Sequence, residues 1–255
     1  MKIAISGKGG VGKTLLASLL ARGFSSHGYS VIAIDADPDT NLAATLGFDS
    51  PEEITPISEM KELIDERTNT GKNSVGSYFK MNPRVDDIPE RYSVEKEGIK
   101  LLVMGQMKRG GSGCYCPENA LLAALMAHLI IARNEVLILD MAAGIEHLGR
   151  GTARAVDRLI IVVEPGRASI ETAKRIIKMA RDIGLKKISL VGNKIRSQED
   201  KGFIYGKLVD YDVLGFIPYD QALMDAEITN TPIFDASSII SQAVDDIYNK
   251  LVSAS

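Results

Sequence analysis

The chain has 255 residues, of which 45% are hydrophobic and 25% charged, with a formal net charge of −3 and no tryptophan. These values are those of an ordinary globular protein and exclude a polyanion binder driven by overall charge, while leaving a local basic patch open. No stretch approaches the roughly 18 consecutive apolar residues of a membrane-spanning helix. The amino-terminal MKIAIS enters a predicted strand without the apolar run of a signal peptide, so we expect a cytoplasmic protein.

Short apolar runs alternate with helical patterns along most of the chain, and such runs are typical of parallel strands buried on both faces. They predict strands at 2–6, 31–35, 100–105, 135–140, 158–164, 187–192 and 212–217. The segments between them predict helices at 13–27, 117–133, 168–183, 199–209 and 238–252. This alternation predicts an α/β fold: a doubly wound, mostly parallel sheet of seven or eight strands with helices on both faces, in a single domain over residues 1–255. Ligands are expected at the carboxyl ends of the strands.

Residues 50–98 interrupt this alternation of strand and helix patterns. They contain four prolines (Pro51, Pro56, Pro83 and Pro89), several charges and few long apolar runs. We predict an irregular insertion with short helices and a small hairpin at the edge of the sheet.

Residues 7–14 read GKGGVGKT between a predicted strand and a predicted helix, which is the context that the phosphate-binding P-loop motif requires. The backbone N–H groups expected to surround the phosphates belong to Gly9, Gly10, Val11 and Gly12. Lys13 is expected to reach the β- and γ-phosphates, and the Thr14 hydroxyl to bind Mg²⁺. The motif therefore predicts a site for a nucleoside triphosphate with Mg²⁺.

The loop holds a second lysine, Lys8, which by itself could be a solvated surface charge. The complete GKGGVGKT pattern resembles the deviant-Walker ATPases, which include partition and septum-site ATPases, the nitrogenase iron protein and metallocentre-maturation ATPases. In that family the extra lysine crosses a dimer interface to the partner's nucleotide, a role like that of an arginine finger in trans. The resemblance thus implies a homodimer promoted by ATP, in which Lys8 is catalytic together with Lys13.

Two further segments resemble the switches of this family. Asp35-Ala36-Asp37-Pro38 is similar to switch I, where the aspartate before the proline, Asp37 here, orients or deprotonates the attacking water. EVLILD followed by MAAG, at 135–144, is similar to Walker B with switch II. That likeness implies that Asp140 lies near Mg²⁺, although an aspartate at a strand end could merely cap a helix. It also implies that Gly144 senses the γ-phosphate.

The resemblance also implies a base-binding region. Asn193-Lys194 follows a predicted strand as the family's adenine-contacting asparagine does, and an amide can both donate and accept hydrogen bonds. GFIPYD, which contains Pro218, is similar to the loop beside the purine. Arg196 stands where GTP-binding proteins usually carry an acidic residue, so we expect ATP and ADP rather than guanine nucleotides.

The two cysteines of the chain, Cys114 and Cys116, form a C-x-C motif ahead of a predicted helix. They could be small apolar residues, a strained redox pair or two independent thiols. Two thiolates cannot complete a four-ligand Zn²⁺ site, whereas a twofold dimer would supply four sulfurs. We therefore favour Ni²⁺ or Zn²⁺ binding at the dimer axis, which would also promote the dimer.

The C-x-C motif, DMAAGIEHLGRG and EPGRASIETAKRI together resemble the carbon monoxide dehydrogenase maturation ATPases. This resemblance implies ATP-dependent support of nickel insertion, carbon monoxide dehydrogenase as client, and neither nucleic acid nor membrane as partner. Ala142 departs from the acidic residue expected there. An iron–sulfur cluster scaffold or carrier ATPase and a partition or septum-site positioning ATPase remain the alternatives.

Overall fold

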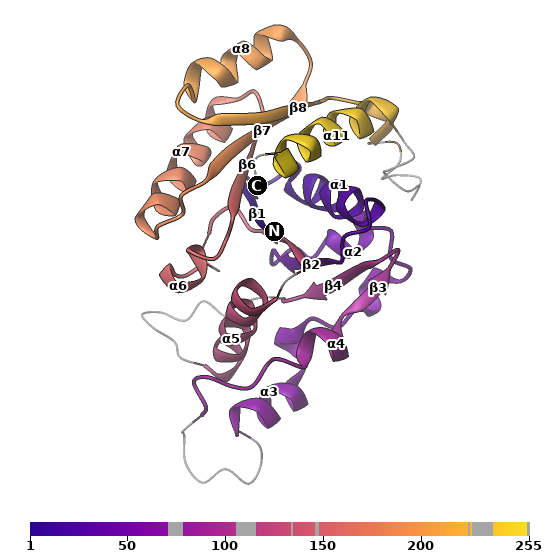
Figure 1. Cartoon of the computed structure of the whole chain (residues 1–255), viewed down its shortest axis with the longest axis vertical. Helices are drawn as coiled ribbons and strands as arrows, with labels where there is room; N and C mark the ends of the chain where they lie inside the picture. The colour runs from indigo at the N-terminus through magenta and orange to yellow at the C-terminus, as the bar shows by residue number, and fades with distance from the viewer. Residues whose placement is uncertain are drawn as a thin grey trace.

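A single mixed sheet forms the centre of the molecule. The computed structural model describes residues 1–70, 79–105, 116–133, 135–145, 148–223, 225 and 237–253. Within these residues eight strands form one sheet in the order β3-β4-β2-β5-β1-β6-β7-β8 (Figure 1). The strands are β1 (Lys2–Gly7), β2 (Val31–Ala36), β3 (Val94–Lys96), β4 (Ile99–Val103), β5 (Val136–Met141), β6 (Arg158–Val163), β7 (Ile188–Ile195) and β8 (Asp212–Pro218). The predicted α/β fold is confirmed, with eight strands.

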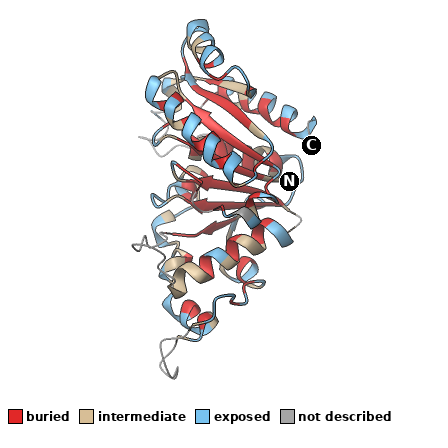
Figure 2. Cartoon of the chain, turned by 90° about the vertical axis from the view of Figure 1, so that its left-hand side faces the viewer, coloured by how far each residue is buried: buried red, intermediate tan, exposed pale blue. Residues whose placement is uncertain are grey.

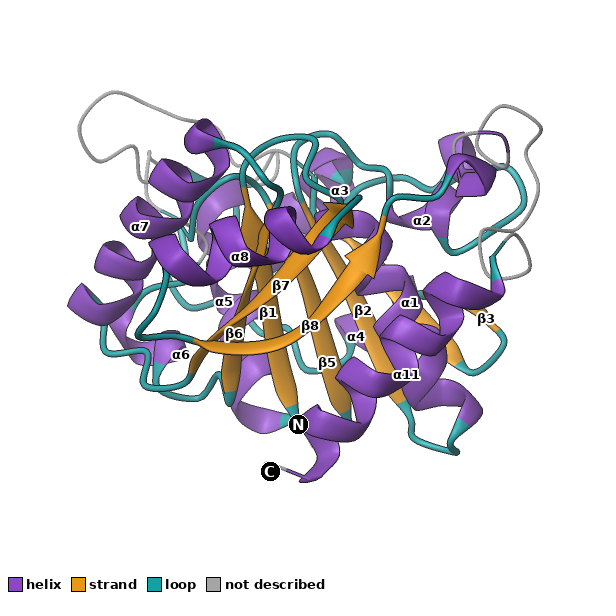
Figure 3. Cartoon of the chain, turned by 90° about the horizontal axis from the view of Figure 1, so that it is seen from above, coloured by secondary structure: helices purple, strands orange, loops and turns teal. Residues whose placement is uncertain are grey.

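Helices connect the strands and cover both faces of the sheet (Figure 3). The α-helices are α1 (Lys13–Ser26), α2 (Leu42–Thr45), α3 (Lys61–Thr68), α4 (Ile88–Tyr92), α5 (Pro117–Ala132), α6 (Arg150–Ala153), α7 (Arg167–Asp182), α8 (Gln198–Lys207) and α11 (Ser238–Ser253). Two short 3₁₀ helices are η1 (Pro51–Glu53) and η2 (Ile57–Glu59). The five long predicted helices begin and end within two residues of α1, α5, α7, α8 and α11.

The apolar strand sequences follow from burial on both faces. Every residue of β2, β5 and β6 is buried, and Figure 2 shows the strands as the buried layer between helices with exposed outer surfaces. The buried side chains form two clusters, one beneath α1, α2 and α11 and the other beneath α3, α5, α7 and α8. This two-sided core holds the central strands rigidly, so the loops at their carboxyl ends start from fixed points.

The predicted edge hairpin is present. β3 pairs antiparallel with β4, with Val94 opposite Leu101. The connecting residues Glu97 and Gly98 both have positive φ, 51° and 75°, as a two-residue hairpin turn of the right twist requires. The other strand pairs are parallel.

The insertion before this hairpin is held by an ion pair. Arg67 of α3 donates to both carboxylate oxygens of Asp87, at 2.9 and 2.7 Å, just before α4. This contact with the guanidinium holds the pKa of Asp87 below its usual range. The bidentate pair therefore joins the two short helices of a segment that has little apolar periodicity of its own.

No helix in the described part of the chain combines the length and apolar character needed to cross a membrane.

Candidate nucleotide site

The loop between β1 and α1 has backbone angles that favour glycine at specific positions. Gly10 and Gly12 have φ of 77° and 94°, in the left-handed region, whereas Gly9 does not. A Cβ on Gly12 would lie 2.2 Å from the Asn193 side-chain nitrogen, and a Cβ on Gly7 would lie 2.5 Å from the Val162 carbonyl oxygen. The glycine-rich sequence therefore follows from conformation and from close packing against β6 and β7.

Lys13 and Thr14 open α1 with their side chains directed to acidic residues. The Lys13 side chain is 7% exposed, and its ammonium lies 3.6 Å from a carboxylate oxygen of Asp37. The Thr14 hydroxyl donates to Asp140 Oδ2 at 2.6 Å. Thus the two P-loop side chains lie beside the aspartates that the sequence assigns to Walker B and switch I.

Asp140 lies on β5 opposite Ile5 of β1 and Asp35 of β2. Burial raises the pKa of Asp140 from 3.8 to about 6, against the opposing effects of the Thr14 hydrogen bond and the Lys13 charge. Its second oxygen, Oδ1, is buried without a hydrogen-bond partner in the described structure. An unpaired buried carboxylate oxygen beside a threonine hydroxyl fits a Mg²⁺ site, because hard cations prefer oxygen ligands.

Asp35 is a residue of this site whose role could not be predicted from the sequence. It is fully buried, and burial raises its pKa from 3.8 to about 7, with the charge of Asp140 acting in the same direction. Its carboxylate accepts hydrogen bonds from the backbone N–H groups of Leu42 at 3.0 Å and Asp37 at 3.2 Å. Asp35 therefore fixes both ends of the loop that carries Asp37.

Asp37 lies where that loop leaves the sheet. Its side chain is 18% exposed, and its carboxylate accepts a hydrogen bond from the Asp39 backbone N–H at 3.2 Å. Because one of its oxygens faces Lys13, the carboxylate lies at the rim of the P-loop and can contact solvent. The expected role of Asp37 toward the attacking water stays a prediction.

Asn193 and Lys194, at the end of β7, hold the P-loop from the other side. The Asn193 amide, 3% exposed, donates to the Val11 carbonyl at 2.7 Å and accepts from the Lys194 backbone at 2.8 Å. The Lys194 ammonium donates to the Gly10 carbonyl at 2.6 Å. This clamp on the loop is a role that the sequence did not indicate, and the expected adenine contact of Asn193 stays a prediction. Pro218, at the end of β8, lies opposite Ile195 of β7, at the same edge of the sheet.

The segment after Asp140 is anchored to the strand before the P-loop. The buried Ser6 hydroxyl donates to the Gly144 carbonyl at 2.7 Å, and the Gly144 N–H donates to the Ala142 carbonyl at 2.6 Å. Ser6, whose role could not be predicted from the sequence either, thus links this segment to β1. A movement of Gly144 would have to break or carry this hydrogen bond.

Lys8, the second lysine of the loop, lies 3.5 Å from Glu164 at the end of β6. The Lys8 side chain is 39% exposed. In this chain its charge therefore faces an acidic residue of the same protomer.

Of the two cysteines, Cys116 is half-buried and occupies the N-cap position of α5 without a side-chain capping hydrogen bond, and Cys114 lies outside the described residues. The Cys116 carbonyl accepts from the Ala120 backbone at 3.0 Å and so starts the helix. No group of three or more potential His, Cys, Asp or Glu metal ligands is found in the part of the chain that the structure describes.

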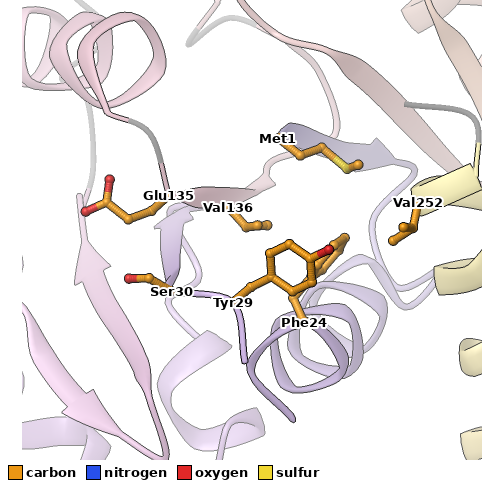
Figure 4. A pocket seen from close by; sticks show the side chains of 7 residues that line it. All are labelled: Met1, Phe24, Tyr29, Ser30, Glu135, Val136 and Val252. Carbon is orange, nitrogen blue, oxygen red and sulfur yellow. The ribbon is translucent and has the colours of Figure 1, made fainter. Parts of the chain in front are cut away.

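A hollow of about 610 Å³ lies at the opposite end of the strands (Figure 4). It is lined by Met1, Phe24, Tyr29, Ser30, Glu135, Val136 and Val252. Its lining is mostly apolar, and its carboxylate, Glu135, is already paired with Arg133. The hollow lies at the amino-terminal ends of the strands and is therefore separate from the P-loop.

Comparison with known proteins agrees with this geometry. The CobQ/CobB/MinD/ParA nucleotide binding domain matches residues 2–233. The chain is 48% identical to the carbon monoxide dehydrogenase accessory protein CooC of Rhodospirillum rubrum, over 93% of this chain and 90% of that protein. It is 44% identical to an uncharacterized ATP-binding protein of Methanocaldococcus jannaschii, over 99% of this chain and 98% of that protein.

Solved structures share the fold. The MinD cell division protein of Aquifex aeolicus superposes with a TM-score of 0.70 and 23% identity, covering 99% of this chain and 97% of that one. A ParA family ATPase of Chlorobium tepidum also reaches 0.70, with 17% identity and coverage of 97% and 98%. The P-loop, the aspartates at the strand ends and the match over residues 2–233 lead to one conclusion: the chain belongs to the CobQ/CobB/MinD/ParA family of P-loop nucleotide-binding domains.

Proposed function

We propose that this protein is a Mg²⁺-dependent ATPase that supports nickel insertion into carbon monoxide dehydrogenase. The observation that carries the proposal is the 48% identity to a carbon monoxide dehydrogenase accessory protein along nearly the whole of both chains. Such similarity extends well beyond the P-loop, which many unrelated activities share.

In the proposed reaction, Lys13 and the loop N–H groups bind the triphosphate, and Asp37 orients the attacking water and accepts its proton. A carboxylate at the rim of the site can reach both water and Lys13, and it lies 3.6 Å from the latter. Thr14 and Asp140 would hold Mg²⁺, which neutralises phosphate charge when bound. Asp35 keeps the Asp37 loop in place through its two backbone hydrogen bonds.

The proposed active unit is a homodimer. Lys8 would reach the nucleotide of the partner subunit, and Cys114 and Cys116 of both chains would bind the transported metal, Ni²⁺ or Zn²⁺. Cys116 supports this arrangement by its half-buried position at the start of α5, next to the rest of the C-x-C motif. Thiolates accept both metals, so chemistry alone does not select between them.

The test is activation of nickel-free carbon monoxide dehydrogenase. Recovery of activity with limiting Ni²⁺ should require both this protein and ATP, and an Asp37→Ala variant, which retains the P-loop, should support it poorly. Equal recovery without the protein would refute the client assignment.

Metal analysis of the anaerobically purified dimer tests the cargo separately. Nickel or zinc without colour agrees with the proposal. Iron with sulfide would instead indicate an iron–sulfur scaffold.

A further inference from the structure

Glu164 is a charged residue of the site that the proposed reaction does not use. It follows β6 directly, and its two carboxylate oxygens contact two lysines. Oε1 lies 3.5 Å from the Lys8 ammonium and Oε2 lies 3.5 Å from the Lys194 ammonium. One carboxylate thus joins the P-loop to the end of β7.

The backbone brings these groups together. β1 and β6 are parallel neighbours with Gly7 opposite Val162, so Lys8 and Glu164 both follow the same edge of the sheet. Gly7 packs against the Val162 carbonyl, where a Cβ would approach to 2.5 Å. The Glu164 backbone is fixed in turn, because its N–H donates to the buried Ser169 hydroxyl at 3.0 Å.

Lys194 makes the arrangement specific. Its ammonium also donates to the Gly10 carbonyl at 2.6 Å, and its backbone has φ of 58°, which is uncommon for a residue with a side chain. Lys194 therefore has a second anchor, whereas among the described residues Lys8 has one ion-pair partner, Glu164. Within the described part of the chain, Lys8 is thus the lysine held by fewer side-chain contacts.

We propose that Glu164 is a positioning residue that keeps Lys8 on its own protomer, and that this contact is exchanged for the partner's nucleotide when two protomers pair. The proposal rests on the proposed function, in which Lys8 acts in trans. A carboxylate and a triphosphate are both anionic, so they compete for the same ammonium. Glu164 thereby opposes pairing in the absence of nucleotide.

The expected change in the dimer dissociation constant can be estimated from how exposed the Lys8–Glu164 ion pair is. The Lys8 and Glu164 side chains are 39% and 26% exposed, and such a pair changes an equilibrium constant by about fivefold at most. Because two contacts are exchanged in each dimer, Glu164→Gln should lower the dimer dissociation constant by about two- to 25-fold. The difference in dimer dissociation constant between Glu164→Gln and wild type should decrease with added salt, because salt screens exposed ion pairs.

The first measurement needs no dimer. Amine labelling of the nucleotide-free monomer with acetic anhydride, quantified by mass spectrometry, should modify Lys8 about 1.4- to fivefold faster in Glu164→Gln, following the strength of the lost pair. Lys178, exposed on α7, is the internal reference. Unchanged Lys8 labelling would overturn the proposal whether or not the protein dimerises.

The second measurement is sedimentation velocity with a non-hydrolysable ATP analogue. The matched control is Glu171→Gln, which removes the same charge from an exposed residue that pairs with Lys174 on α7. The proposal is supported if Glu164→Gln dimerises more tightly than wild type and Glu171→Gln does not. The exchange is overturned if the wild type dimerises and Glu164→Gln shows faster Lys8 labelling but weaker or unchanged dimerisation. If no variant and no wild-type chain pairs with nucleotide, the proposed dimer fails together with the exchange.

Discussion

Replacing Gly12 by alanine should destabilise the protein in a way that can be calculated from the P-loop. At φ of 94° an alanine costs about 1–2 kcal/mol relative to glycine. The new Cβ would lie 2.2 Å from the Asn193 amide nitrogen and would displace it from the Val11 carbonyl. Loss of that buried hydrogen bond adds about 1–3 kcal/mol, so Gly12→Ala should lower the free energy of unfolding by about 2–5 kcal/mol.

Two neighbouring glycines provide a graded comparison. Gly10→Ala meets no atom within 4 Å but has φ of 77°, so it should lose only the conformational part, about 1–2 kcal/mol. Gly9→Ala meets neither constraint, so its free energy of unfolding should be close to that of wild type.

Urea unfolding followed by circular dichroism is the assay, because the chain has no tryptophan for fluorescence. A fluorescent ATP analogue would report nucleotide affinity in parallel. If Gly12→Ala is as stable as Gly9→Ala and binds nucleotide equally well, the described loop geometry is wrong. If Gly10→Ala is as costly as Gly12→Ala, the contact with Asn193 contributes nothing.

Three other predictions concern the aspartates and the cysteines. Asp37→Ala should bind ATP but hydrolyse it at least tenfold more slowly, since general-base catalysis typically contributes about 10²–10⁴-fold; equal turnover in a phosphate-release assay would remove its assignment. Asp35 has a pKa raised from 3.8 to about 7 in the folded protein. In Mg²⁺-free buffer, its contribution to the free energy of unfolding is therefore fully present below pH 3.8 and is lost as pH rises through 7. Wild type should therefore lose up to about 4 kcal/mol of unfolding free energy relative to Asp35→Asn over this range, and parallel pH profiles of the two proteins would contradict the burial argument. Cys114→Ser and Cys116→Ser should each abolish tight Ni²⁺ or Zn²⁺ binding while ATP hydrolysis persists, and isothermal titration that finds one metal per monomer would contradict a shared site.

The sequence predicted best those features that depend on local pattern. Buried parallel strands are apolar throughout, so the central strands could be located from composition alone, and the P-loop is a contiguous motif. The edge hairpin was also predictable as a small element, although the three-residue β3 is too short to have a period of its own.

What the sequence did not reveal depends on contacts between distant segments. Asn193 bonds to Val11, and Glu164 lies between Lys8 and Lys194, only because β6 lies beside β1 and β7 lies beside β6 in the order of the sheet. Nothing in the residues around Asp35 or Ser6 indicates their partners. The motif predicted the groups that would face a ligand, whereas the groups that hold them in place could be found only from the fold.

The two borders of the sheet have a consequence for the behaviour of the protein at high concentration. β3 is short and carries Glu95, which is exposed, and Lys96, which donates to the Gly47 carbonyl. At the other border β8 leaves regular register with β7 at two places and ends at Pro218, which has no N–H. Neither border offers a long, regular row of backbone groups to a strand from another molecule. The folded protein should therefore resist fibrous aggregation by strand addition, even when it is concentrated for crystallisation or scattering experiments.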